Sequence, residues 1–416
     1  MAGDHLLGPL DLPSGLTLVL EKDAVLRFTD DFEAYHPVLT RWEGAMCHAM
    51  HPLVFARGVR NLRIEGEGTL DGQGRAWWEA LKEKRRGGQN GPVLSVERAL
   101  AALDKGDPKP SGGGGRETFF LRPPLIQLFE CEDVSISGIR LKDSPFWTLH
   151  PIYSRRIEIS GIRIENPSDA PNTDGIDIDS CEDVRIEDCL VDVGDDCLAL
   201  KAGSGALGVE EGRPTRRVSV SGCTFRSGHG GVVVGSETAG GVEDVEVSDC
   251  RFLGTDRGIR IKSRRGRGGL VRNLGFSDLR MEGVLAPVTI NLYYNCGADP
   301  KDAPRLFSLD PIPPSALTPM VRDIRIARLE ALGCRASAGF VAGLPESRIE
   351  NLSLEDCRIT LAQEGLVPVE NSEMYQGLPA TESRGLRLRH VDCEARGLSV
   401  EGGSVDLEEG ARLENR

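Results

Sequence analysis

Residues 172–201 read Asn-Thr-Asp-Gly-Ile-Asp-Ile-Asp-Ser-Cys-Glu-Asp-Val-Arg-Ile-Glu-Asp-Cys-Leu-Val-Asp-Val-Gly-Asp-Asp-Cys-Leu-Ala-Leu-Lys. The apolar alternations at 176–178 and 198–200 predict two short strands. Three carboxylates stand just ahead of these strands: Asp174, Asp195 and Asp196. If the strands are neighbours, the carboxylates converge, and like charges brought that close raise the pKa of at least one of them. Acid–base chemistry uses this arrangement.

The central part of residues 172–201 belongs to a repeat. Val184-x-Ile186-x-x-Cys189 is one copy of an apolar-x-apolar-x-x-apolar pattern, and the first positions of neighbouring copies lie between 23 residues (134 to 157) and 50 residues (274 to 324) apart. A period in the twenties that varies by insertion indicates a solenoid whose loops absorb the differences. The copies begin at Val134, Ile157, Val184, Val218, Val245, Leu274, Ile324, Leu352 and Leu386.

The strands in this repeat are short and are separated by Gly, Asp, Asn and Ser, without the 10–15-residue helical patterns that a βαβ fold requires. The consensus of leucine-rich repeats is also absent. We therefore predict an all-β protein, a parallel β-helix of about ten coils that forms one domain over residues 1–416. Residues 6–28 are expected to form the first, partial coils.

Cysteine usage fits an apolar interior. The eleven Cys have no regular CxxC spacing, so neither a zinc site nor a disulfide framework is indicated. Several Cys share one repeat position with Ile139, Ile162 and Leu279, which favours buried free thiols. The cysteines at that position are Cys189, Cys223, Cys250 and Cys357.

Charge and hydropathy limit the partners. The formal net charge is −14, which argues against nucleic acid or an anionic membrane as the main partner. No stretch of about 18 apolar residues exists. The first residues, Met-Ala-Gly-Asp-His, lack the features of a secretory signal, so we expect a cytoplasmic protein, or a secreted or periplasmic one if a leader has been removed.

Residues 76–129 interrupt the repeat. The segments 79–86 and 94–104 are predicted helices, and a flexible Gly-rich tract follows at 111–115. An insertion of this size on a solenoid is expected to wall or cover the binding face.

A second strand recurs later in each coil. Aligning Ile176, Leu198, Val232 and Ile259 as inward residues places Asp177, Ala199, Val233 and Arg260 in one outward row, and Asp179, Lys201, Gly235 and Lys262 in the next. Adjacent coils lie about 4.8 Å apart. Asp174 then nearly touches Asp196, with Asp195 beside them and His229 one coil further on.

This arrangement suits hydrolysis of an acidic polysaccharide. A glycosidase needs a protonated carboxylic acid for the leaving oxygen and a carboxylate that activates water or attacks the sugar. His229 could tune the proton of the acid. Arg260 and Lys262 offer a fork and a point charge for an anionic group such as a uronic-acid carboxylate. Any one of these Asp residues alone would fit a turn role at a coil corner.

The chain resembles glycoside hydrolase family 28, the polygalacturonase family of right-handed parallel β-helices. The resemblance covers roughly residues 6–400 and rests on four segments, Asn172-Thr173-Asp174, Gly194-Asp195-Asp196, Gly228-His229-Gly230 and Arg260-Ile261-Lys262. It implies hydrolysis of α-1,4-galacturonosyl bonds with inversion, without a metal or any other cofactor.

The resemblance also implies residue roles. Asp195 would be the general acid, with its protonation supported by His229. Asp174 and Asp196 would orient and deprotonate the attacking water. The galacturonate carboxylate would bind to Arg260 and Lys262. Inverting enzymes usually hold their carboxyl groups further apart than adjacent coils do, so inversion rests on the resemblance alone.

Three further segments, 40–44, 166–174 and 256–268, look like bacterial exo-acting members of the family. Together with the insertion they suggest a cleft that is closed at one end and releases galacturonate from a chain terminus. Candidate sugar contacts are Asn172, His150, and Tyr293 or Tyr294.

The start of the chain departs from the family. The short helix that usually caps the first coil is missing, so association through the uncapped coil is expected to be possible. Alternative functions are a rhamnogalacturonan or xylogalacturonan hydrolase, a calcium-dependent pectate-lyase-like enzyme, and a non-catalytic pectin-binding solenoid.

Overall fold

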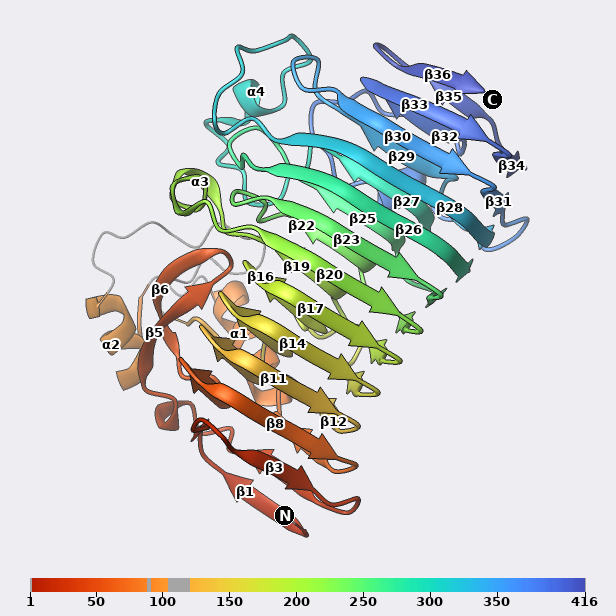
Figure 1. Ribbon diagram of the computed structural model, residues 1–416. Coiled ribbons are helices and arrows are strands. Elements are labelled where there is room, and N and C mark those ends of the chain that lie inside the picture. The colour runs from red at the N-terminus through yellow and green to blue at the C-terminus, as the bar shows by residue number, and fades with distance from the viewer. Residues whose placement is uncertain (1, 88–90, 104–119, 416) are drawn as a thin grey trace.

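The computed structural model describes residues 2–87, 91–103 and 120–415. Its strands stack in parallel, coil upon coil, from the N-terminal end of the chain to the C-terminal end (Figure 1). This confirms the predicted parallel β-helix. The predicted Gly-rich tract at 111–115 lies outside the described residues.

The repeat pattern forms the first column of strands. Val134 pairs with Ile157, Ile157 with Val184 and Val184 with Val218, as predicted. The column contains β8 (Arg60–Gly66), β11 (Glu132–Ser137), β14 (Arg155–Ser160), β17 (Glu182–Glu187), β20 (Thr215–Ser221), β23 (Val242–Ser248), β26 (Leu270–Glu282), β28 (Met320–Cys334), β30 (Ile349–Glu355), β33 (Val391–Arg396) and β36 (Arg412–Asn415).

The prediction that a repeat copy begins at Leu386 is wrong. Leu386 starts β32 (Leu386–Arg389), which belongs to the second sheet, whereas Leu352 pairs with Cys393 in β33. The two segments share the same alternation, so pattern matching alone could not separate them.

A short strand follows the first one in most coils. It is separated from the longer strand by a turn and packs into the same sheet. These strands are β9 (Thr69–Asp71), β12 (Arg140–Lys142), β15 (Arg163–Glu165), β18 (Leu190–Asp192), β21 (Thr224–Arg226), β24 (Arg251–Leu253), β31 (Arg358–Leu361) and β34 (Ser399–Glu401). The first coil contributes β1 (Asp4–Leu7), β3 (Thr17–Leu20) and β4 (Val25–Phe28) to this sheet.

Over the residues that the structure describes, the second sheet has twelve parallel strands, compared with the predicted number of about ten coils. Its strands are β2 (Leu10–Asp11), β7 (Val54–Arg57), β10 (Ile126–Phe129), β13 (Leu149–Ile152), β16 (Ile176–Asp179), β19 (Asp196–Lys201), β22 (Gly230–Gly235), β25 (Arg257–Lys262), β27 (Ala286–Asn291), β29 (Gly339–Ala342), β32 and β35 (Val405–Leu407). Since β10 is a regular member, the insertion ends before Ile126 rather than at residue 129.

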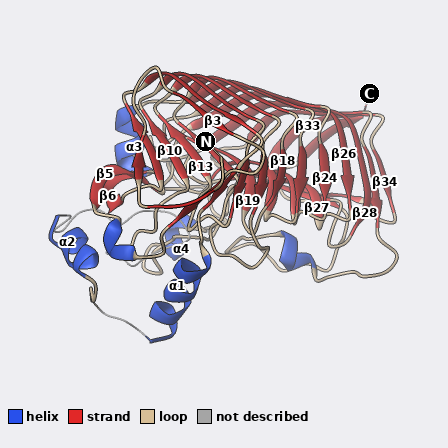
Figure 2. Cartoon of the chain, turned by 90° about the horizontal axis from the view of Figure 1, so that it is seen from below, coloured by secondary structure: helices blue, strands red, loops and turns tan. Residues whose placement is uncertain are grey.

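Helices lie outside the strand stack (Figure 2). The insertion forms α1 (Arg75–Gly87) and α2 (Ser95–Leu103), which confirms its two predicted helices. Two short helices sit in later loops, α3 (Gly205–Glu211) and α4 (Ala303–Leu306), and two 3-10 turns are η1 (Phe32–Ala34) and η2 (Val369–Ser372). None of the described helices is long and apolar enough to cross a membrane.

One hairpin stands apart from the two sheets. Strands β5 (Pro37–Trp42) and β6 (Ala45–Met50) are antiparallel and, among the described strands, pair with each other alone. Glu43 and Gly44 both have positive φ, as a tight hairpin turn requires. The hairpin carries residues 40–44, the segment that looks like exo-acting relatives, and it lies beside the N-terminal half of the solenoid (Figure 1).

The main core is a continuous apolar cluster that runs from Leu12 to Ala395, with two smaller clusters beside it. The cysteines at the shared repeat position are buried, as predicted, and all eleven cysteines are free thiols. Phe225 and Phe252 pack against each other in the main core with tilted rings whose centroids lie 5.3 Å apart, and both are fully buried.

The Phe252→Ala variant should lower the free energy of unfolding by about 3–5 kcal/mol, because it leaves a cavity beneath Phe225. Equilibrium urea unfolding followed by circular dichroism would measure the change. Leu207→Ala is the control: Leu207 is exposed on α3, so its truncation should change stability by less than about 0.5 kcal/mol. A loss below about 1 kcal/mol for Phe252→Ala would contradict this packing.

Candidate active site

The predicted register of the second sheet is confirmed. Ile176 on β16 faces Leu198 on β19, and Leu198 faces Val232 on β22. This brings Asp174 beside the pair Asp195–Asp196, and one oxygen from each of the three carboxylates lies within 4.8 Å of the others. The structure therefore brings the three predicted acids together.

Asp196 is paired with two cations. Nη1 of Arg260 donates to Oδ1 at 2.9 Å, and Nζ of Lys262 donates to Oδ2 at 2.5 Å. Both cations come from β25, two strands further along the sheet. They reach Asp196 across Gly230, where an added Cβ would lie 2.5 Å from Val233 Cγ2 and 3.2 Å from both Arg260 Cδ and Asp196 Oδ1. A larger residue at this position would therefore press on the pair Arg260–Asp196 and on Val233.

These two cations control the charge of Asp196. Burial raises the pKa of Asp196, but the ammonium of Lys262 and the guanidinium of Arg260 more than offset this effect and hold the pKa below its ordinary value. Asp196 is therefore ionised at neutral pH. It can accept a proton or orient a water molecule.

Asp195 is paired with His229. The imidazole Nδ1 lies 3.2 Å from Oδ1 of Asp195, and the backbone N–H of His229 donates to the Asp195 carbonyl. The His229 side chain is half exposed, and Asp195 is the one member of the trio that is not fully buried. Hydrogen bonding to Asp195 raises the pKa of His229. The pair therefore meets solvent, and its electrostatics favour a protonated imidazole beside an ionised carboxylate.

The carboxyl group with a strongly raised pKa is Asp174. Burial is the main cause, followed by repulsion from Asp195 and Asp177. For Asp195, burial raises the pKa, but the hydrogen bond from His229 outweighs it and the net pKa is lowered. Without substrate, the carboxyl of the trio that holds a proton most firmly is thus Asp174, whereas in the Asp195–His229 pair the proton favours the imidazole. The general-acid role of Asp195 stays a prediction.

Two predicted sugar contacts lie in the interior. Tyr293 is fully buried, with Arg265 packed over its ring at 5.9 Å, so the prediction that it binds substrate is wrong. His150 is also buried, with Nδ1 3.1 Å from Gln127 Nε2. The neighbouring Tyr294 is the tyrosine at the site, since its ring lies 5.7 Å from Arg260 and 5.5 Å from Lys262. The sequence could not tell which of two adjacent tyrosines points inward.

Asn172 already has a structural partner. Nη2 of Arg122 donates to its side-chain oxygen at 2.7 Å, and Asn172 adopts a positive φ of 56° at the turn before Asp174. Asparagine tolerates this conformation better than most residues. Its binding of substrate stays a prediction.

A segment far along the chain covers the cation pair. Residues 371–376, here called the strap, run across β25 and β27. Arg257 donates to the Ser372 carbonyl at 3.0 Å and to the Asn371 carbonyl at 2.8 Å. Nη2 of Arg260 lies 3.1 Å from Sδ of Met374. The strap lies more than 100 residues from these partners in the sequence and carries no motif, so it could not be predicted from the sequence.

The three Asp residues are also the group of side chains, within the described ranges, whose spacing could suit a metal ion. However, Arg260 and Lys262 occupy both oxygens of Asp196. A metal ion would have to displace one cation or lie against both of them. We therefore assign no metal ligands here, and the expected independence from cofactors stays a prediction.

Comparison with known proteins agrees with these motifs. Residues 115–305 match the family described as Glycosyl hydrolases family 28. A probable polygalacturonase of Vitis vinifera is 31% identical over 87% of this chain and 66% of its own length. An endo-polygalacturonase of Pectobacterium carotovorum subsp. carotovorum is 29% identical over 70% of this chain and 65% of its own length. The chain thus spans about two thirds of these curated relatives.

Two solved structures have the same fold. The exopolygalacturonase of Thermotoga maritima is 30% identical, covers 87% of this chain and 79% of its own chain, and superposes with a TM-score of 0.73. The family 28 exopolygalacturonase of Yersinia enterocolitica, 20% identical, covers 100% of this chain and 70% of its own chain with a TM-score of 0.69. The second likeness concerns the fold alone.

The pair Asp195–His229 gives a direct test of the electrostatics. His229 should titrate above about 6.5, the ordinary value for histidine, and Asp195→Asn should lower its pKa. Because the folded-state pKa is raised, the stabilisation by protonated His229 is present below about pH 6.5 and is lost as the pH rises through the folded-state pKa. NMR titration of the imidazole resonances would measure this. Asp192→Asn on β18 is the control and should leave His229 unchanged; a wild-type pKa at or below 6.5 would contradict the pairing.

Proposed function

The chain belongs to glycoside hydrolase family 28, and from this premise we propose that it hydrolyses the α-1,4 bonds of polygalacturonate or oligogalacturonides. The observation that carries the proposal is the contrast within the acid trio. Asp196 is held ionised by two cations, and Asp195 is hydrogen-bonded at the solvent-exposed edge to His229, whose pKa is raised. Two carboxyl groups in different protonation environments can act as base and acid.

The proposed reaction has two proton transfers, one to the leaving glycosidic oxygen and one from the attacking water. Asp195 passes a proton that it takes from His229 to the glycosidic oxygen as the bond from C1 to that oxygen breaks. Asp196 and Asp174 hold a water molecule, and one of them takes its proton as the water oxygen bonds to C1. His229 is the group from which Asp195 can regain a proton.

Arg260 and Lys262 support a uronic acid as the sugar beside the cleaved bond. Both cations are buried and both pair with Asp196. Two positive charges against one carboxylate leave a net positive charge at this position. A guanidinium and an ammonium favour a substrate carboxylate at this position. The strap lies over Arg260, so a carboxylate must take the place of Met374 Sδ to reach the guanidinium.

Exo action is supported by the hairpin β5–β6. Thr40 donates to the side chain of Gln127 at 2.6 Å, which covers the outward row on β10. Trp42 stacks on Phe146 with centroids 4.6 Å apart and donates to the Arg122 carbonyl. The sheet on the N-terminal side of Asp174 is thus occupied by protein, leaving little length there for a polysaccharide.

Replacing Asp195 by Asn should lower kcat on polygalacturonate by about 10²–10⁴-fold, because the leaving oxygen then lacks its proton donor. Reducing-end assays would measure turnover, and calorimetry with an oligogalacturonide would show that binding persists. Asp192→Asn is the matched control and should keep wild-type activity. Substantial activity of Asp195→Asn would contradict the acid role.

Product analysis tests the mode of attack. Wild-type protein acting on polygalacturonate and on trigalacturonate should release galacturonate alone from the first minutes, because the hairpin blocks the N-terminal side of the site. Chromatography of early time points would resolve the products. A ladder of oligomers at early times would contradict exo action, and an unsaturated product would indicate a lyase.

A further inference from the structure

We propose that Lys201 is a positioning residue of this site: its buried ammonium holds the base side of the acid trio in place and connects it to the hairpin β5–β6. The inference rests on the proposed hydrolase function. Lys201 stands at the end of β19 in the same outward row as Lys262, and no motif of the family resemblance includes it.

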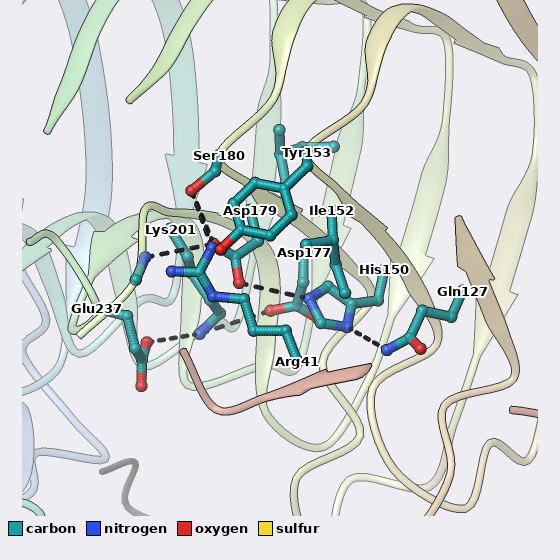
Figure 3. Close-up of polar contacts among 12 residues, drawn as sticks. Arg41, Gln127, His150, Ile152, Tyr153, Asp177, Asp179, Ser180, Lys201 and Glu237 are labelled. Atoms are coloured by element: carbon teal, nitrogen blue, oxygen red, sulfur yellow. Dashed lines mark hydrogen bonds and ion pairs between the residues drawn. The ribbon is translucent and has the colours of Figure 1, made fainter. Parts of the chain in front are cut away.

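The ammonium of Lys201 lies among three carboxylates. Its Nζ is 3.2 Å from Glu237 Oε2, 3.5 Å from Asp177 Oδ1 and 4.0 Å from Asp174 Oδ2. It also lies 4.4 Å from the ring centroid of Trp147. Figure 3 shows Lys201 between Asp177 and Glu237. A lysine that is only 3% exposed therefore joins the trio to two acids outside it.

The surrounding acids depend on this charge. Both carboxylate oxygens of Asp177 are buried and accept no hydrogen bond, so the ion pair with Lys201 is the polar contact found for them in the structure. Burial raises the pKa of Glu237, but the ammonium of Lys201 and, after it, Arg267 more than offset this effect, so the pKa is lowered. Removing one partner of a buried ion pair leaves an uncompensated charge. Lys201 therefore keeps Glu237 ionised and acts to lower the pKa of Asp177, which burial still raises well above its ordinary value.

Asp174 differs from Asp196 in its cations. Asp196 contacts Arg260 and Lys262. For Asp174, the cation among the groups that most strongly affect its pKa is Lys201. The charged and titratable groups that face this cluster from the surrounding elements are Arg41, His150, Asp174, Asp177, Asp179, Asp195, Asp196, Glu237, Lys262 and Arg267. Without Lys201, repulsion from Asp195, Asp177 and Asp196 would act on Asp174 without the cation that now lowers its pKa, which disfavours its ionised form.

The same cluster anchors the hairpin. Nη1 of Arg41 donates to Ser180 Oγ at 3.1 Å and lies 3.4 Å from Asp179 (Figure 3). The turn of the hairpin packs against Glu237, since a Cβ added to Gly44 would lie 2.8 Å from Glu237 Cγ. Glu237 therefore contacts both Lys201 and the hairpin turn. The same network of charged side chains therefore contacts both the hairpin, which covers the N-terminal side of the site, and Asp174 on the base side of the acid trio.

The test compares Lys201→Met, Lys201→Arg and wild type by kcat, KM and the pH profile of kcat/KM on trigalacturonate. Lys201→Met should lower kcat about 100-fold with a smaller change in KM. Its acid limb should move to higher pH, because loss of the ammonium raises the pKa of Asp174. Lys201→Arg should restore the limb and most of kcat. Lys142→Met is the matched control: Lys142 also pairs with two acids, Asp71 and Asp143, and its loss should leave the profile unchanged.

A second variant covers the case in which Lys201→Met does not fold. Glu237→Gln removes a negative charge beside Lys201, so the acid limb should move to lower pH, opposite to the first shift. An unshifted limb in a folded Lys201→Met protein, or in Glu237→Gln when the first variant does not fold, overturns the positioning role. If wild type does not cleave galacturonides at all, the proposed function fails instead.

Discussion

The in-register stacking of parallel strands in the second sheet is the constraint on which the site depends. Ile176, Leu198, Val232 and Ile259 occupy one inward row, so the residues around them keep fixed positions from coil to coil. Strands about 4.8 Å apart bring acids that are some twenty residues apart in sequence into contact. A one-residue slip on any of these strands would turn its functional side chains into the core.

Three neighbouring carboxylates cannot share one environment at low cost, and the structure gives each a different cation. Asp196 has Arg260 and Lys262, Asp195 has His229, and Asp174 has Lys201 at the edge of contact. The pKa values of the acids follow the number and distance of their cations. The pKa of Asp196, which has two close cations, is lowered, and that of Asp174, which has one distant cation, is raised. The different proton affinities thus come from which strand supplies each cation.

Much of this could be predicted from the sequence, because a repeat converts spacing into position. The apolar pattern determined which strands are neighbours, and the rows placed Asp174, Asp195 and Asp196 together with His229, Arg260 and Lys262.

Prediction from the repeat was wrong or silent where the position of a residue does not follow from the spacing of the apolar pattern. The alternation at Leu386 fits either sheet, and of two adjacent buried tyrosines only Tyr294 lies beside Arg260 and Lys262. The strap reaches the site from a part of the chain more than 100 residues away. Lys201 was placed in its row, but its partner Glu237 lies in a loop that the repeat does not constrain.

The hairpin and the strap cover the site from opposite sides with contacts of different strength. The hairpin is held by a buried guanidinium, since Arg41 lies within ion-pair distance of Asp179 and Glu211. Breaking a buried ion pair costs about 3–5 kcal/mol. The strap offers Arg257 backbone carbonyls and offers Arg260 a thioether, which are weaker acceptors than a carboxylate. The carboxylate of the uronate proposed as substrate would replace weak acceptors with a strong one at these arginines, whereas entry under the hairpin would have to separate paired charges. For that proposed substrate, the balance of contacts favours access from the side of the strap.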